Sequence, residues 1–244
     1  RIALVGAGGM AFGPVMTYDT MCAEEMRGST LVLVDINERR LEIVRAAAEQ
    51  LNKALGEPVR IEAESDTARG VEGADFVLLS VEKARWEGWR MDYEIPKKHG
   101  ALQVMGENGG PGGMFHSLRS IKLILEIAEL IEQNSPDAFI VNLTNPMSRV
   151  TLALDRATNL RNVGLCHEHF GGLLRLSVML LKSIEKIDAK ASGINHFTWF
   201  YDIRDAETGE DLYPKALRHV RRFPFMHPPL VRRCVEEFGL FPTS

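Results

Sequence analysis

The chain has 244 residues, 45% of them hydrophobic and 25% charged, and a formal net charge of −4. These values are typical of a globular protein, and the slight negative balance argues against a nucleic-acid-binding protein. No apolar run approaches the roughly 20 residues of a membrane-spanning helix, so we expect no membrane partner. The three cysteines are odd in number and widely separated, which fits a reducing cytoplasm better than a disulfide framework.

Short apolar runs alternate with helical segments along most of the chain. Arg1 leads directly into the first run, so we expect no signal peptide, and we expect a few native residues to precede it. Long helices are expected over about 38–55, capped by Asn37, and over about 113–134. Continuous apolar strands between helices predict a parallel sheet covered on both faces, a Rossmann-type doubly wound α/β fold. The expected strands cover residues 2–5, 31–35, 76–81, 139–141 and 162–165.

The pattern changes near residue 187. Segments 189–194 and 197–203 predict antiparallel strands, and they lead into a polar turn. We therefore expect a Rossmann domain over residues 1–170 and a second, α+β domain over 171–244. This second domain is expected to be the start of a substrate domain, truncated where the chain ends.

A glycine-rich segment follows the first strand and opens a helix. It matches the G-x-G-x-x-G/A fingerprint of dinucleotide sites, in which glycines allow a tight turn and let backbone approach the pyrophosphate. Ala11 is expected to allow close packing of helix on strand. Asp35 ends the second strand, where a carboxylate can bind the ribose hydroxyls and would repel a 2′-phosphate, so we expect NAD. The fingerprint residues are Gly6, Ala7, Gly8, Gly9, Met10 and Ala11.

Two later strand ends should reach the same edge of the sheet. Ser80, Val81 and Glu82 end one strand and are expected beside the cofactor. Asn145 precedes Pro146 at the end of another, and its amide offers both a donor and an acceptor to a ligand.

The stretch GLCHEHFGG places Cys166 and His167 at the end of a further strand, and His196 lies about thirty residues on. Thiolate and imidazole are ligands that transition ions select. A buried small cysteine with solvated histidines is an equally ordinary pattern, and the residues alone leave both interpretations open.

Five segments together resemble glycoside hydrolase family 4, the NAD- and manganese-dependent glycosidases. They occur in family order and cover nearly the whole chain: GAGGMAFGP, GENGGPGGMFHSLRSI, NLTNPMSRV, GLCHEHFGG and SGINHFTWF. Cys-His-Glu together with GINHFTW is most similar to the branches that act on unphosphorylated α-glycosides, the α-galacturonidases and α-glucosidases. His169 stands where the family usually has a small aliphatic residue.

The resemblance implies a role for several residues. Cys166 and His196 would bind a divalent metal, Mn²⁺, and His167 would act as the acid near the leaving oxygen. Asn145 would contact both the cofactor and the sugar hydroxyls. Further sugar contacts would come from Arg85, Glu107 and Asn108.

The implied reaction is hydrolysis of an α-glycoside with NAD as a recycled cofactor. NAD⁺ would oxidise C3 of the sugar, the C2 proton would leave, and the glycosidic oxygen would be eliminated before water adds and the hydride returns. The expected tyrosine base would lie beyond the end of this chain, and a homo-oligomer, a dimer or tetramer, is expected. An NAD-dependent 2-hydroxy-acid dehydrogenase is the main alternative, and a catalytically inactive nucleotide-binding module is the second.

Overall fold

The computed structural model describes residues 1–102, 109–194 and 196–243. The chain divides into two compact units: the N-terminal unit, Arg1–Leu165, and the C-terminal unit, Cys166–Ser244. No helix among the described residues is both long enough and apolar enough to cross a membrane.

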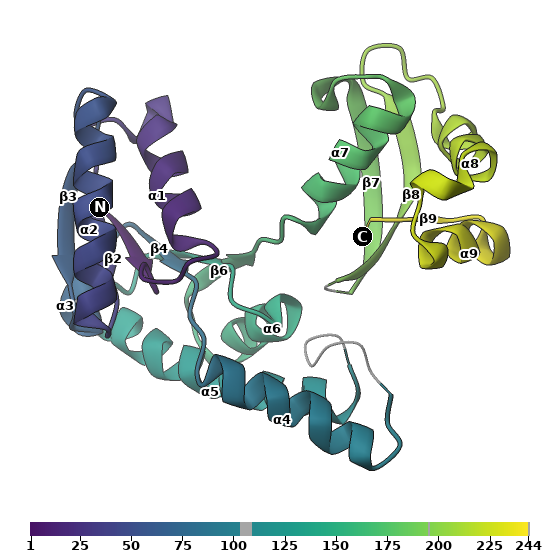
Figure 1. Cartoon of the computed structure of the whole chain (residues 1–244). Coiled ribbons are helices and arrows are strands. Elements are labelled where there is room, and N and C mark those ends of the chain that lie inside the picture. The colour runs from purple at the N-terminus through teal and green to yellow at the C-terminus, as the bar shows by residue number, and fades with distance from the viewer. Residues whose placement is uncertain (103–108, 195, 244) are drawn as a thin grey trace. The chain divides into compact units, whose positions relative to one another are not determined.

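The N-terminal unit is built on a six-stranded parallel sheet (Figure 1). Its strand order is β3-β2-β1-β4-β5-β6. Successive strands are added on one side of β1 up to β3 and on its other side from β4 onward, and this order confirms the predicted Rossmann-type fold. Ligands of such sheets bind outside the carboxyl ends of the strands where the order reverses, between β1 and β4. The strands are β1 (Ile2–Val5), β2 (Thr30–Val34), β3 (Arg60–Glu64), β4 (Phe76–Leu79), β5 (Phe139–Asn142) and β6 (Arg161–Gly164).

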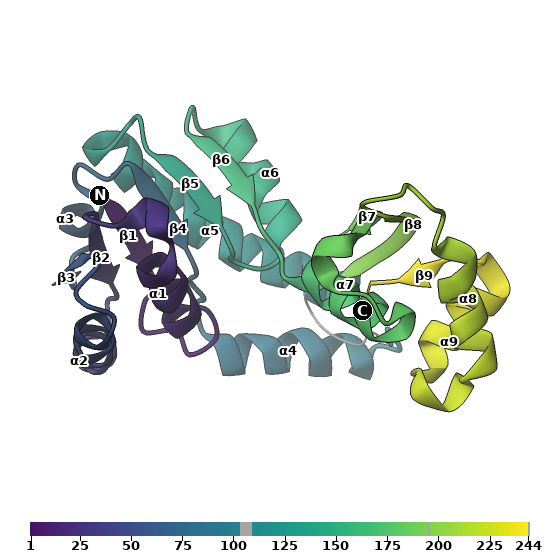
Figure 2. The same cartoon turned by 90° about the horizontal axis from the view of Figure 1, so that it is seen from above.

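Helices cover both faces of this sheet, as can be followed in Figure 2. On one face, α1 and α2 pack with Leu4, Leu31 and Leu33. On the other, α3, α5 and α6 pack with strand residues that include Val77 and Ile140. The helices are α1 (Gly13–Cys22), η1 (Glu24–Met26), α2 (Glu38–Ala54), α3 (Thr67–Val71), α4 (Arg85–Lys98), α5 (Gly110–Asn134) and α6 (Met147–Ala157). The Asn37 side chain accepts a hydrogen bond from the Arg40 N–H, which confirms the predicted cap of α2.

In the described residues of the C-terminal unit, three α-helices pack beside a three-stranded antiparallel sheet of order β7-β8-β9, so the predicted antiparallel pairing is confirmed. Its core contains the fully buried Phe200 and Phe241, whose rings stack. The elements are α7 (Glu168–Leu180), η2 (Ile184–Lys186), β7 (Ile187–Ile194), β8 (Phe197–Asp205), α8 (Tyr213–Arg222), η3 (Pro224–Met226), α9 (Pro229–Phe238) and β9 (Phe241–Pro242).

Asp205 closes the turn after β8, and its side chain is only 5% exposed. It pairs with Lys182 and accepts hydrogen bonds from the backbone N–H groups of Glu207 and Thr208. Lys182, followed by these backbone donors, holds the pKa of Asp205 well below its usual range. A carboxyl whose folded-state pKa is lowered stabilises the fold above its ordinary pKa of about 4 and loses that contribution as pH falls through the lowered value.

We therefore expect Asp205→Asn to lower the melting temperature by several degrees at pH 7, and the difference from the unaltered protein to shrink below about pH 4. Thermal unfolding followed by circular dichroism between pH 7 and pH 2 measures this. The exposed Asp188 gives the matched control, Asp188→Asn. A difference that is the same at every pH would contradict the assigned ion pair.

Candidate functional site

The glycine-rich loop after β1 is tied to the end of β2. The N–H groups of Gly6 and Ala7 both donate to the Val34 carbonyl, at 2.8 and 3.0 Å. The N–H of Gly8 donates to Asp35 Oδ2 at 2.8 Å, and Asp35 Oδ1 accepts from the Asn37 N–H at 2.9 Å. The carboxylate that the sequence assigns to a ribose therefore also orients the loop beside it.

Two glycines of this segment allow close backbone approach. Gly6 has φ +90°, and a Cβ there would lie 2.0 Å from the Ser80 carbonyl oxygen. Gly13 is the buried first residue of α1, and a Cβ there would lie 2.1 Å from the Ala7 carbonyl oxygen. Ala11 is exposed and precedes the helix. The expectation that Ala11 allows close packing of helix on strand is therefore wrong, because the helix begins two residues later, at Gly13, and the close approach there is to the loop residue Ala7.

The ends of β4 and β5 meet this loop at the same edge of the sheet. The Ser80 N–H donates to the Val5 carbonyl at 2.9 Å, and the Val81 N–H donates to Thr144 Oγ1 at 3.0 Å. Asn145 follows β5 half-buried, and its Oδ1 accepts from the Met147 N–H at 3.3 Å. The structure thus gathers the predicted cofactor residues of the N-terminal unit at one edge, while their binding of a cofactor stays a prediction.

Glu82 has neighbours that the sequence did not predict. Its Oε1 lies 3.3 Å from His116 Nε2 and 3.4 Å from Trp89 Nε1. His116 is 1% exposed, and neither ring nitrogen makes an aligned hydrogen bond within the described part of the chain. In the sequence this histidine looks like one more position on an amphipathic helix, and only the fold places it beside Glu82.

The other predicted sugar contacts have different outcomes. Arg85 is the first residue of α4, and its guanidinium lies 5.2 Å from the Trp89 ring centroid and 5.8 Å from that of Trp86. Its contact with sugar stays a prediction. Glu107 and Asn108 lie outside the described residues.

The predicted metal ligands belong to two segments of the C-terminal unit. Cys166 is a half-buried thiol just before α7, and the exposed His167 is the N-cap of that helix. His196 lies between β7 and β8 with φ 57°. The His196 N–H donates to Glu168 Oε2 at 2.9 Å, so a residue two positions after Cys166 holds the backbone of His196.

This arrangement fits a metal site only in part. No group of three or more His, Cys, Asp or Glu residues is placed to hold an ion within residues 1–102, 109–194 and 196–243. Cys166 and His196 would supply two donors, and oxygen ligands from water or substrate would have to complete the coordination that Mn²⁺ prefers.

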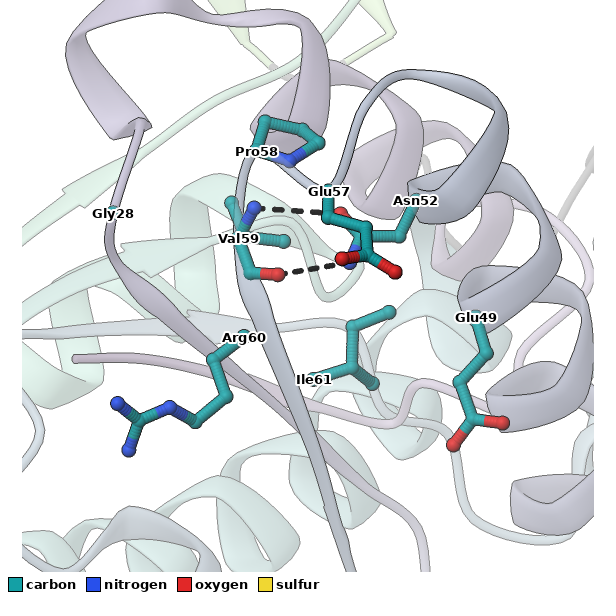
Figure 3. A pocket seen from close by; sticks show the side chains of 8 residues that line it. All are labelled: Gly28, Glu49, Asn52, Glu57, Pro58, Val59, Arg60 and Ile61. Atoms are coloured by element: carbon teal, nitrogen blue, oxygen red, sulfur yellow. Dashed lines mark hydrogen bonds between the residues drawn. The ribbon is translucent and has the colours of Figure 1, made fainter.

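The N-terminal unit has a pocket of about 460 Å³ where β3 begins (Figure 3). Asn52 and Val59 both line it, and they are hydrogen-bonded to each other: Asn52 Nδ2 donates to the Val59 carbonyl at 2.8 Å, and Asn52 Oδ1 accepts from the Val59 N–H at 3.3 Å. These bonds connect α2 to β3. The pocket lies at the amino ends of the strands, opposite the edge where ligands of such sheets bind, so we assign it a structural role.

Comparison with known proteins gives consistent matches along the whole chain. The family model described as family 4 glycosyl hydrolase matches residues 1–182, and the model of its C-terminal domain matches residues 191–244. An alpha-glucosidase of Erwinia rhapontici is 38% identical over 215 residues, 87% of this chain and 48% of that protein. An alpha-galactosidase of Bacillus subtilis is 30% identical over 247 residues, 100% of this chain and 57% of that protein.

Solved structures of larger proteins share the fold. A 6-phospho-alpha-glucosidase from gut microorganisms, in complex with NAD and Mn²⁺, has a TM-score of 0.87 and 25% identity. The match covers 99% of this chain and 58% of that one. The chain therefore spans about half the length of the relatives that it matches.

Proposed function

The chain belongs to glycosyl hydrolase family 4, and from that premise we propose that it is the NAD-binding and metal-binding part of an α-glycosidase. The observation that carries the proposal is the glycine loop at the reversal of the sheet, where the Gly8 N–H donates to Asp35 at 2.8 Å. A loop of this kind has a direct use in dinucleotide binding.

The N-terminal unit would bind NAD. The residues of its carboxyl edge would do so: Gly6, Ala7, Gly8, Gly9, Met10, Ala11, Asp35, Ser80, Val81, Glu82 and Asn145. The positive end of the α1 dipole would face the pyrophosphate, although the Gly13 N–H already donates to the Gly9 carbonyl and Pro14 has no N–H to offer. The Asp35 carboxylate would accept hydrogen bonds from the ribose hydroxyls and would repel a 2′-phosphate.

The C-terminal unit would hold the divalent cation, Mn²⁺, through the thiolate of Cys166 and the imidazole of His196. When bound, NAD⁺ supplies a reversible hydride acceptor for C3 of the sugar, and the cation supplies a Lewis acid for the C3 carbonyl. His167 would donate a proton to the leaving glycosidic oxygen. Asn145 would hold sugar hydroxyls through its amide.

The substrate would be an unphosphorylated α-glycoside or uronide. The sequence Cys166-His167-Glu168 supports this choice, because it is most similar to the α-glucosidase and α-galacturonidase branches. We also propose a cytoplasmic location, where a reducing environment protects the Cys166 thiol from oxidation, and assembly into a homo-oligomer.

The test uses full-length protein with NAD⁺, Mn²⁺ and a reductant, and a panel of aryl α-glycosides deuterated at C2, uronides and 6-phosphates included. We expect release of the aryl alcohol from an unphosphorylated substrate, loss of the C2 deuterium to solvent, and no net NADH. Retained deuterium would rule out elimination. NADH accumulation with a 2-hydroxy acid would favour a dehydrogenase, and NAD binding without metal-dependent turnover would favour an inactive module.

A further inference from the structure

His196 has an unusual backbone for a residue assigned to a metal. Its φ of 57° lies in the left-handed region, where non-glycine residues are uncommon because the side chain crowds the backbone. Such a conformation persists only where surrounding contacts fix it. One contact that fixes it is the 2.9 Å hydrogen bond from its N–H to Glu168 Oε2.

The other oxygen of Glu168 is anchored in the core of the same unit. Glu168 Oε1 accepts a hydrogen bond from the Thr243 hydroxyl at 2.6 Å, and Thr243 is 1% exposed. The Thr243 N–H in turn donates to the Thr198 carbonyl at 3.0 Å, so this anchor is part of the sheet. Glu168 is also the first residue of α7, where the helix dipole favours a negative charge.

We propose that Glu168 is the positioning residue of the metal site: it fixes the backbone of His196 so that the imidazole is held for the same cation as the Cys166 thiolate. The inference rests on the proposed function. Two observations support this role: Glu168 lies two residues after Cys166, and its carboxylate accepts a hydrogen bond from the His196 N–H. Residues that orient metal ligands in this way typically change metal affinity by about 10- to 100-fold when they are replaced.

The test compares three variants of the full-length protein. Glu168→Ala removes both bonds, and Glu168→Asp keeps the charge while it withdraws the carboxylate by one methylene. Thr243→Val is the matched control, because it removes the hydroxyl contacts with Glu168 Oε1 and with the Thr198 carbonyl and leaves the bond from the His196 N–H to Glu168 Oε2. Affinity for Mn²⁺ alone is measured from the free-ion signal in electron paramagnetic resonance, and hydrogen exchange is followed at the His196 amide.

We expect both Glu168 variants to weaken Mn²⁺ affinity about 10- to 100-fold and to speed exchange of the His196 amide. Thr243→Val should lower the melting temperature while Mn²⁺ affinity stays within about twofold of that of the unaltered protein. If Glu168→Ala does not fold, Glu168→Asp alone decides.

Three results would count against the inference. Unchanged affinity in Glu168→Asp, or an equal loss in Thr243→Val, would overturn the positioning role alone. If the unaltered protein binds no Mn²⁺, the metal assignment of the proposed function fails and the inference fails with it.

Discussion

Cys166→Ser is expected to abolish metal-dependent glycosidase activity in the full-length protein while NAD⁺ binding is retained. A serine hydroxyl stays protonated near neutral pH and is a poor substitute for a thiolate ligand, whereas the glycine loop and Asp35 belong to the other unit of the chain. Loss of a residue that only orients a metal ligand typically lowers metal affinity or activity by about 10- to 100-fold. Loss of the ligand itself should therefore lower turnover by more than about a hundredfold.

Turnover with Mn²⁺ and binding of NAD⁺ by fluorescence titration are measured on the same preparation. The exposed Cys22 of α1 supplies the control, and Cys22→Ser should leave both quantities unchanged. Unchanged turnover in Cys166→Ser would refute the ligand assignment. A simultaneous loss of NAD⁺ binding would point to general damage to the fold.

Gly13→Ala is expected to destabilise the N-terminal unit and to weaken NAD⁺ binding at least tenfold. The added Cβ would lie 2.1 Å from the Ala7 carbonyl oxygen, so the start of α1 would have to move away from the loop that precedes it. Forcing extra atoms into a packed interior costs about 1–3 kcal/mol, which lowers the melting temperature by several degrees.

Ala11→Val is the matched comparison for this experiment. Ala11 is exposed, so the structure predicts little change in melting temperature, whereas the G-x-G-x-x-G/A spacing predicts the larger loss at residue 11. Thermal unfolding of the two variants side by side decides between these assignments. A larger destabilisation by Ala11→Val would show that the loop packs as the short motif suggests.

The central strands could be predicted from the sequence because burial on both faces leaves them almost wholly apolar. β1 and β2 contain Ile2–Val5 and Leu31–Val34, which are fully or nearly fully buried. The strand β3, with sequence RIEAE, is a partly exposed edge strand. It was not predicted, because charged residues alternate with apolar ones and no continuous apolar run marks it. The helix α4 contains Gly88 and Pro96, residues that usually interrupt helices, and it was also missed.

Only those residues of the candidate site that directly follow a strand could be placed from the sequence. Asp35 and Asn145 could be placed because parallel strands bring their carboxyl ends to one edge. Glu168 could not be assigned a role, since its partner is a backbone N–H 28 residues away and no residue type marks such a bond. Gly13 was missed because the loop before it departs from the usual length.

The two hydrogen bonds of Asp35 have a consequence for engineering the cofactor preference. Exchanging this carboxylate for a neutral or basic side chain, the usual first step toward accepting a 2′-phosphate, would also release the backbone of Gly8 and Asn37. A successful redesign would therefore have to rebuild the loop and the coenzyme contact together, by supplying a new acceptor for those two amides.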